Sequence, residues 1–152
     1  ACMILVIVTG AVILGHFLAV TRIPFEVAGW VAELRLPHTA VMGIILFVYL
    51  VGGCFMDALA LILLTVPIFF PVILALEFDP IWFGVIIVIV TEMGLITPPV
   101  GLNVYIIKGI DNVPMNTVFK GVYPFLVADV LEVALLIAFP QITLFLPQLL
   151  GI

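Results

Sequence analysis

The segment at residues 94–103 holds the groups of this chain that are best suited to chemistry. Its sequence is Gly-Leu-Ile-Thr-Pro-Pro-Val-Gly-Leu-Asn, and it interrupts the apolar stretch at residues 81–107. Pro98 and Pro99 have no backbone N–H and each clashes with the preceding helical turn, so they cannot lie inside a regular helix. We therefore predict two half-helices joined by an extended segment. The interruption leaves carbonyls of the first half and N–H groups of the second without intrahelical partners.

These unpaired backbone groups favour two kinds of ligand. A cation suits the carbonyl side, and an anion suits the start of the second half-helix, where the helix dipole is positive. Thr97 adds a hydroxyl oxygen beside the carbonyls, and Asn103 adds an amide on the first turn of the second half. The break contains no carboxylate, which fits sodium, because sodium prefers oxygen ligands and needs no formal charge from its site. We expect a sodium ion here, and we expect Thr97, Pro98 and Asn103 to contact a solute.

Discontinuous helices that bind both a cation and an anionic solute are typical of ion-coupled secondary transporters. The alternative is that Pro98 and Pro99 only kink a packed helix, in a membrane assembly or structural subunit that has no transport site. Two prolines that lie between two glycines and are flanked by Thr97 and Asn103 favour transport over this alternative.

The composition places these elements in a membrane. The chain is 66% apolar and 9% charged, with a mean hydropathy of +1.54, whereas about 25% of a typical soluble domain is charged. So few charges exclude an ordinary soluble domain, and the high apolar content excludes a disordered chain. Four Lys and Arg residues against nine Asp and Glu residues leave no basic surface for nucleic acid. An integral protein of the lipid bilayer remains.

A spanning helix and an interfacial helix come first. Residues 3–20 carry no charge and are long enough for one transmembrane helix. Residues 22–37 are amphipathic and are bounded by Pro24 and Pro37. This pattern favours a helix that lies in the membrane interface over a solvated loop.

Residues 39–76 predict a re-entrant helical hairpin. The first limb, residues 41–51, would cover about half of the hydrocarbon thickness at about 1.5 Å per residue. Gly52 and Gly53 would break the run, and the chain would then return through residues 58–76. A tip at membrane depth must be buried in protein or face water. One continuous kinked helix is the alternative.

The remaining elements follow from turns and polar stretches. Asp79 and Pro80 form a favourable N-cap and first-turn pair for the helix that leads to the break. Residues 111–121 are polar and predict a surface turn with a short helix. Residues 122–139 predict the last span, and residues 140–152 an interfacial tail. The chain begins inside an apolar run without an initiator methionine, so we expect a piece of a longer protein.

Few ionisable groups enter the apolar runs. Asp57 and Glu92 lie near the two breaks, and intramembrane carboxylates are functional candidates by default; the alternative is a packing or interfacial role with a hydrogen-bonded partner. Asp129 and Glu132 share one face of the last span and are expected to face protein or headgroups. His16 stands alone on an apolar helix and is expected to pack. The chain has no serine nucleophile and no pair of histidines at metal-binding spacing, so we expect no enzyme.

The string at residues 94–103 resembles the signature of the large membrane subunit (DctM family) of TRAP transporters, the tripartite ATP-independent periplasmic transporters. Weaker matches flank it: Phe55-Met56-Asp57, Pro67-Ile68 with Pro71, Asp79-Pro80 with Phe83-Gly84, and Tyr123-Pro124-Phe125. The resemblance covers nearly the whole chain, which corresponds to the C-terminal third of such a subunit.

The resemblance implies an all-α, elevator-type transporter built from two inverted repeats, one of which is this chain. A sodium ion would lie between the hairpin tip and the break, at the carbonyls of Gly53, Gly94 and Val100, with Thr97 contributing. The resemblance implies four parts. Residues 1–21 would form a scaffold transmembrane helix, and residues 22–38 an interfacial arm helix. Residues 39–111 would form the transport-domain hairpin and the broken helix, and residues 112–152 a surface helix, the last transmembrane helix and an interfacial tail.

The expected function is that of a permease subunit in the bacterial inner membrane. It would import an organic acid anion, such as a C4-dicarboxylate or sialic acid, by symport with sodium. Its partners would be a small membrane subunit and a periplasmic solute-binding protein that delivers the anion.

Overall fold

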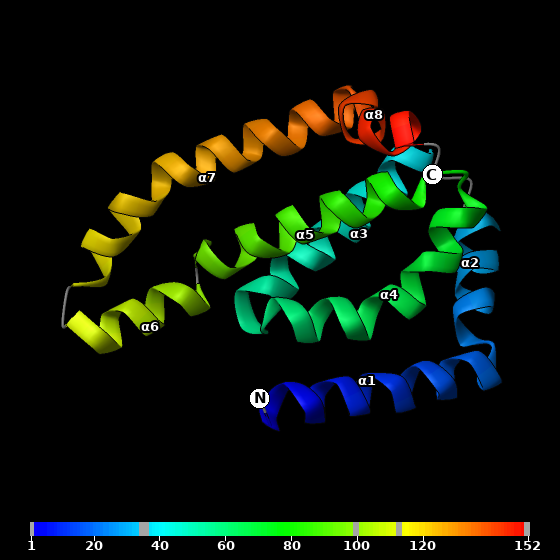
Figure 1. Cartoon of the computed structure of the whole chain (residues 1–152), viewed down its shortest axis with the longest axis horizontal. Helices are drawn as coiled ribbons and strands as arrows, with labels where there is room; N and C mark the ends of the chain where they lie inside the picture. The colour runs from blue at the N-terminus through cyan, green and yellow to red at the C-terminus, as the bar shows by residue number, and fades with distance from the viewer. Residues whose placement is uncertain (1, 34–36, 99–100, 112–113, 151–152) are drawn as a thin grey trace.

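The computed structural model describes residues 2–33, 37–98, 101–111 and 114–150, and this part of the chain is helical without strands (Figure 1). The helices are, in chain order, α1 (Cys2–Thr21), α2 (Ile23–Glu33), α3 (His38–Phe55), α4 (Ala58–Ala75), α5 (Pro80–Ile96), α6 (Leu102–Asp111), α7 (Met115–Ala138) and α8 (Pro140–Leu150). Four of them, α1, α3, α4 and α7, are long and apolar enough to cross a membrane. The predicted class, an all-α membrane protein, is confirmed.

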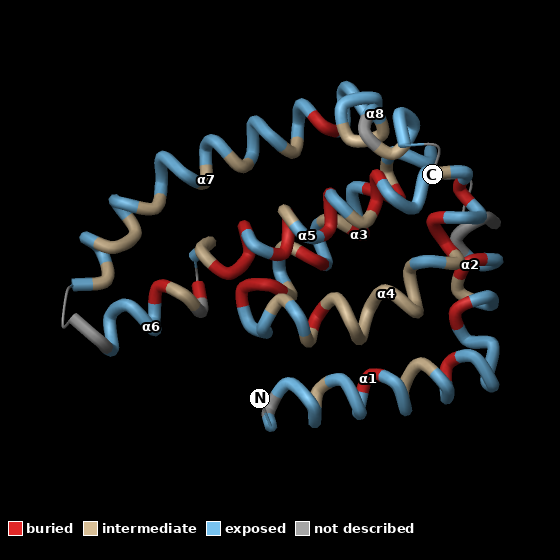
Figure 2. The backbone as a smooth tube through the Cα atoms, in the orientation of Figure 1, coloured by how far each residue is buried: buried red, intermediate tan, exposed pale blue. Residues whose placement is uncertain are grey.

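Burial divides these helices into a packed centre and an exposed surround. Figure 2 shows α1 and α7 exposed over most of their length, with buried residues concentrated in α3 and α5. Only 6% of α7 and 11% of the apolar part of α1 are buried, against 33% of α3. Apolar helix faces of this length need lipid or further protein around them. The packed centre is therefore the part that can hold a site in fixed geometry.

The hairpin of α3 and α4 turns later than the sequence predicts. α3 continues as a helix through Gly52 and Gly53, and the chain turns at Met56 and Asp57. The prediction of a short first limb that ends before the glycine pair is wrong, because α3 has 18 residues and is long enough by itself to span a membrane. Glycine weakens a helix by about 1 kcal/mol, and the packing of α3 against α5 offsets this weakness.

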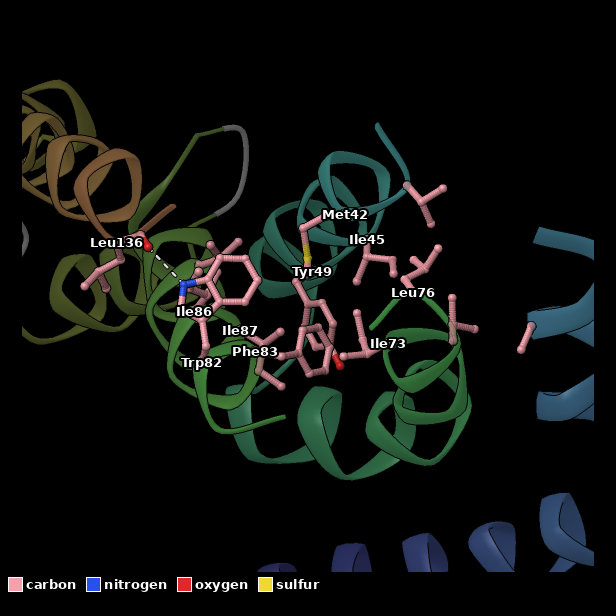
Figure 3. Packing of buried hydrophobic residues seen from close by; sticks show 14 of the residues in the cluster. Met42, Ile45, Tyr49, Ile73, Leu76, Trp82, Phe83, Ile86, Ile87 and Leu136 are labelled. Carbon is pink, nitrogen blue, oxygen red and sulfur yellow. Dashed lines mark hydrogen bonds between the residues drawn. The ribbon is translucent and has the colours of Figure 1, made fainter. Parts of the chain in front are cut away.

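An apolar cluster joins α3, α4 and α5 and also includes Ala28 of α2 and Leu136 of α7 (Figure 3). Tyr49 of α3 lies within it with 1% of its surface exposed. Its ring lies 5.7 Å from the ring of Phe69 in α4 and 6.4 Å from that of Phe83 in α5, between centroids. Its hydroxyl shares a hydrogen bond of 2.7 Å with Thr65 Oγ1 of α4. The buried polar tip of Tyr49 is thereby satisfied, and the bond ties the two limbs of the hairpin together.

α3 and α5 touch through their backbones at Gly53 and Gly94. A Cβ at Gly53 would lie 2.6 Å from the Thr91 carbonyl oxygen, and a Cβ at Gly94 would lie 2.6 Å from the Leu50 carbonyl oxygen. A Cβ at Gly94 would also lie 2.8 Å from the Cα of Gly53. Any side chain at either position would collide with backbone atoms, which cannot rotate away. Small residues allow this close approach of helices in membranes, and the contact fixes where α5 crosses the end of α3.

The start of α5 is fixed to the far end of α7. Asp79 accepts hydrogen bonds from the N–H groups of Ile81 and Trp82 at 2.8 and 3.2 Å, which confirms the predicted N-cap. The indole Nε1 of Trp82 donates to the Leu136 carbonyl at 2.9 Å (Figure 3). Four residues after Leu136 stands Pro140, which has no N–H to offer that carbonyl. Trp82 therefore replaces the helical hydrogen bond that Pro140 removes at the boundary of α7 and α8.

The predicted interfacial arm corresponds to α2, with two differences. Pro24 lies inside the first turn of α2 and does not precede the helix as predicted. Proline is tolerated there, because N–H groups in the first turn of a helix make no intrahelical hydrogen bond. Val27 and Ala28 pack against the apolar cluster, whereas Phe25 and Trp30 are 63% and 64% exposed. The predicted end of the arm, at residues 34–36, lies outside the described residues.

The predicted surface helix and last span are one helix. α7 runs without interruption from Met115 to Ala138, so the prediction of a separate short helix before the span is wrong. The polar residues that suggested a surface turn, Asn116 and Lys120, occupy the first turns of the long helix. Pro124 lies inside this helix, where it removes one backbone N–H and its ring crowds the preceding turn. Residues 112–113 lie outside the described part.

We predict that Gly94→Ala lowers the free energy of unfolding by about 1–3 kcal/mol, because the added methyl group forces α3 and α5 apart. Gly84→Ala is the matched control, since it lies on the same helix and a Cβ there has nothing within 4 Å. The thermal unfolding midpoint of the full-length protein in detergent measures both variants. Equal midpoints for the two variants would contradict the backbone contact.

Candidate functional site

The predicted interruption at the centre of the broken helix is present. α5 ends at Ile96, and α6 begins at Leu102. Gly101 precedes α6 with a φ of +58°, a left-handed conformation that side chains rarely adopt. A Cβ at Gly101 would also lie 3.3 Å from Val104 Cγ2 and 3.4 Å from the Thr97 carbonyl oxygen. A glycine is therefore needed at this position for the chain to turn from the break into α6.

The end of α5 presents carbonyl oxygens that the backbone cannot pair. The Thr97 N–H bonds back to the Gly94 carbonyl at 3.2 Å, which closes the last turn. The Leu95 carbonyl has no such partner, because the residues three and four positions ahead are Pro98 and Pro99. In hydrocarbon an unsatisfied carbonyl costs several kcal/mol. A ligand that accepts electron density from this oxygen, such as a cation, relieves that cost.

The Thr97 hydroxyl is oriented by the same turn. Its Oγ1 donates to the Met93 carbonyl at 2.6 Å, and the residue is half-buried. Because the only hydroxyl proton is used in this bond, the oxygen offers lone pairs to a ligand. This orientation is compatible with the predicted role of Thr97 as an oxygen ligand, and that role stays a prediction.

The tip of the hairpin supplies a second group of carbonyl oxygens. The N–H of Met56 bonds to the Gly52 carbonyl at 2.9 Å. In the described structure, no backbone N–H bonds to the carbonyls of the next three residues, Gly53, Cys54 and Phe55. The contact between Gly53 and Gly94 brings this tip beside the end of α5 (Figure 1). Two sets of unpaired carbonyls therefore lie on adjacent helix ends.

The predicted site residues are not all gathered at one point. Gly53 and Gly94 are buried and in contact, and Thr97 lies one turn beyond Gly94. Asn103 is half-buried in the first turn of α6, and Pro98 is exposed. Val100 lies outside the described residues. The sodium and solute assignments at these positions stay predictions.

The carboxylates near the site have different surroundings. Asp57 caps α4 and accepts hydrogen bonds from the N–H groups of Leu59 and Ala60 at 3.1 and 3.4 Å, which is the packing alternative for this residue. Glu92 is exposed on α5. In the described ranges, no three His, Cys, Asp or Glu side chains gather in a way that could hold a metal ion. The oxygens at the break are therefore mainly backbone carbonyls.

Sequence reasoning missed a group of side chains beside the break. Asn116, Phe119, Lys120 and Tyr123 of α7 line a cavity with Pro98. The signal for them was their spacing, since Asn116, Lys120 and Tyr123 lie four and three residues apart and so share one helix face. Assigning residues 111–121 to a surface turn concealed this pattern.

A helical hairpin packed on a discontinuous helix, among four described helices that are apolar enough to span a membrane, is typical of membrane transporters. Comparison with known proteins identifies the family. The chain belongs to the family described as the tripartite ATP-independent periplasmic transporter, DctM component, whose family model matches residues 1–142.

Curated relatives agree with this assignment. The chain is 36% identical to the C4-dicarboxylate TRAP transporter large permease protein DctM of Pseudomonas aeruginosa, over 98% of this chain and 35% of the relative. It is 34% identical to the sialic acid TRAP transporter large permease protein SiaM of Vibrio cholerae, over 93% and 33%. It is 31% identical to the isethionate TRAP transporter permease protein DctMQ of Oleidesulfovibrio alaskensis, over 98% and 22%. The chain spans about a third or less of the length of these three relatives.

The family fixes the general class of the chain. The family consists of multi-pass transporter components of the bacterial inner membrane, which agrees with the apolar helices of the fold. Transporter permeases are not an enzyme family.

We predict that Asp57 acts as a helix cap. Asp57→Asn should keep both stability and transport at every pH, because asparagine caps a helix as well as aspartate and carries no titratable proton. Asp57→Ala should lower the free energy of unfolding by about 0.5–2 kcal/mol. Thermal midpoints and solute uptake across a pH series measure the two variants. Loss of uptake in a stable Asp57→Asn protein would show that the charge itself is required.

Proposed function

We propose that this chain is the C-terminal portion of a sodium-coupled permease subunit that imports an organic acid anion. The observation that carries the proposal is the pair of unpaired carbonyl groups at the hairpin tip and at the end of α5. Their partial negative charges, with the Thr97 hydroxyl oxygen, suit a monovalent cation that prefers oxygen ligands. The contact between Gly53 and Gly94 supports a single site between the two helix ends.

The proposed ion site uses Thr97 and the carbonyls of Gly53 and Gly94, with Val100 as a further ligand by resemblance. The Gly94 carbonyl already accepts the Thr97 N–H, so it would bind the ion through its second lone pair, beside the unpaired carbonyl of Leu95. A bound sodium ion would balance the partial negative charges of these oxygens. Repulsion among carbonyl oxygens that point to one place disfavours their close approach when no cation is present. Packing brings the two helix ends together, and in this proposal the bound ion orients the carbonyls of the tip and the break. Thr97, Pro98 and Asn103 then form one side of the solute site.

The proposed mechanism is alternating access by movement of a compact body. α3, α4 and α5 share one apolar cluster, and this shared core suits a unit that moves without changing its internal packing. α2 is the proposed arm, and its residue Ala28 is buried in the same cluster. In this proposal α1 belongs to the fixed scaffold, which packs against a small membrane subunit. A periplasmic solute-binding protein delivers the anion.

The relatives narrow the class of solute. Their names include C4-dicarboxylate, sialic acid and isethionate, and all of these solutes are small organic anions. We assign an organic anion to this chain on that basis. The particular solute is decided by the whole permease and its binding protein.

We predict that Thr97→Val raises the sodium concentration for half-maximal uptake by about tenfold or more, because it removes one oxygen ligand and keeps the side-chain shape. The measurement is uptake of radiolabelled solute into proteoliposomes that contain the full-length permease, the small subunit and the binding protein. Thr21→Val is the matched control, because Thr21 also donates to the carbonyl four residues back, at 2.9 Å, but lies at the end of α1.

The result also separates the two candidate roles of the chain. A Thr97→Val protein with an unchanged sodium dependence would contradict the ion site. If the break were only a packing kink in a structural subunit, Pro98→Ala with Pro99→Ala would retain full function, whereas the transport proposal expects its loss.

A further inference from the structure

A cavity of about 370 Å³ lies between the break and the first turns of α7. Its lining residues are Pro98, Asn116, Phe119, Lys120 and Tyr123. The volume falls in the range of about 300–1,000 Å³ that is usual for small-molecule sites. The cavity shares Pro98 with the break and takes its other walls from a helix that contributes nothing to the proposed ion site.

The polar side chains of this cavity are all hydrogen-bond donors. Asn116, Lys120 and Tyr123 recur at a spacing of four and three residues, which places the amide, the ammonium and the phenol on one face of α7. Phe119 and Pro98 add apolar surface. None of the lining residues that the structure describes is a carboxylate. The ammonium of Lys120, with two neutral hydrogen-bond donors and apolar surface nearby, suits the carboxylate of a small organic acid.

Lys120 is an unusual residue for its position. It belongs to α7, a helix long and apolar enough to span a membrane, and the whole chain has only four Lys and Arg residues. Among the side chains that the structure describes, no carboxylate lies within 4.0 Å of its ammonium group. Basic residues in membrane helices are costly and mark ion or substrate pathways unless they reach the headgroups. An anion bound in the cavity would neutralise the positive charge of Lys120.

We propose that this cavity is a second anion site, in which Lys120, Asn116 and Tyr123 bind a carboxylate of the transported solute on the α7 side of the break. The inference rests on the proposed function in one respect, namely that the solute is an organic acid anion. It adds a cationic group on the α7 side of the break, whereas the predicted solute residues Thr97, Pro98 and Asn103 carry no charge. Lys120 is thus a determinant of anion selectivity and does not contact the sodium site.

The competing occupant is the phosphate of a lipid headgroup. Lys120 lies near the start of α7, and long basic side chains near helix ends can extend to the membrane interface. Pro98 lines the same half-open cavity and belongs to the break, and this continuity with the proposed solute site favours a small carboxylate over a headgroup. The two occupants predict different effects of Lys120 on the binding of a soluble anion.

The test is equilibrium binding of succinate and of N-acetylneuraminate to the purified full-length permease, in sodium chloride and in sodium-free choline chloride. Lys120→Gln should weaken binding by about tenfold or more in both salts, because a charge-assisted hydrogen bond is lost. Lys120→Arg should retain most of the affinity. Lys108→Gln is the matched control, since Lys108 is an exposed lysine on α6 that does not line the cavity, and it should bind like the unmodified protein.

Each outcome decides between the proposals. Equal binding by Lys120→Gln and Lys108→Gln would overturn the anion site, and so would an unmodified protein that binds neither anion. Added phosphatidylglycerol tests the headgroup alternative. If it does not displace succinate or N-acetylneuraminate, and Lys120→Gln weakens only the binding of the lipid, then the cavity holds a headgroup and the proposal fails. Sodium-free binding that depends on Lys120, in a protein without sodium-driven uptake, would refute the proposed function but support the second site.

Discussion

The backbone contact between Gly53 and Gly94 is the constraint on which the rest of the structure depends. It joins the end of α3 to the end of α5 at the point where both helices run out of hydrogen-bond partners. The apolar cluster around Tyr49 holds the same helices together farther from the break. Because the cluster sets the orientation of the helices and the glycines set their separation, the unpaired carbonyls are held near one another by packing alone.

Most of the polar groups near the break that could bind a ligand belong to the backbone and not to side chains. Side-chain charges are few, and Asp57 and Asp79 are both used to cap helices. In an apolar solvent each interruption of a helix exposes strong dipoles without adding a formal charge. The proposed ion site, built in this way, would release its ion readily, since no full negative charge would hold the ion in place.

The elements that could be predicted were those with a local cause. Two adjacent prolines, Pro98 and Pro99, end a helix by local backbone chemistry, and Asp79 with Pro80 starts one, so both boundaries were correct. The turn of the hairpin was misplaced because Gly52 and Gly53 weaken a helix locally, and only the contact with α5 explains why the helix continues. The pairing of Gly53 with Gly94 was expected only from resemblance to a family. The wall formed by Asn116, Lys120 and Tyr123 was missed, because it depends on α7 folding back beside the break.

The bond from Trp82 to the Leu136 carbonyl gives the chain an internal optical reporter. The chain has two tryptophans: Trp82 is 5% exposed and bonded to α7, and Trp30 is 64% exposed on α2. An indole whose N–H is bonded to the main chain of a neighbouring helix has a fluorescence that depends on that bond. Emission from Trp82, with Trp30 replaced by phenylalanine, therefore follows the docking of α5 on α7 without any added label.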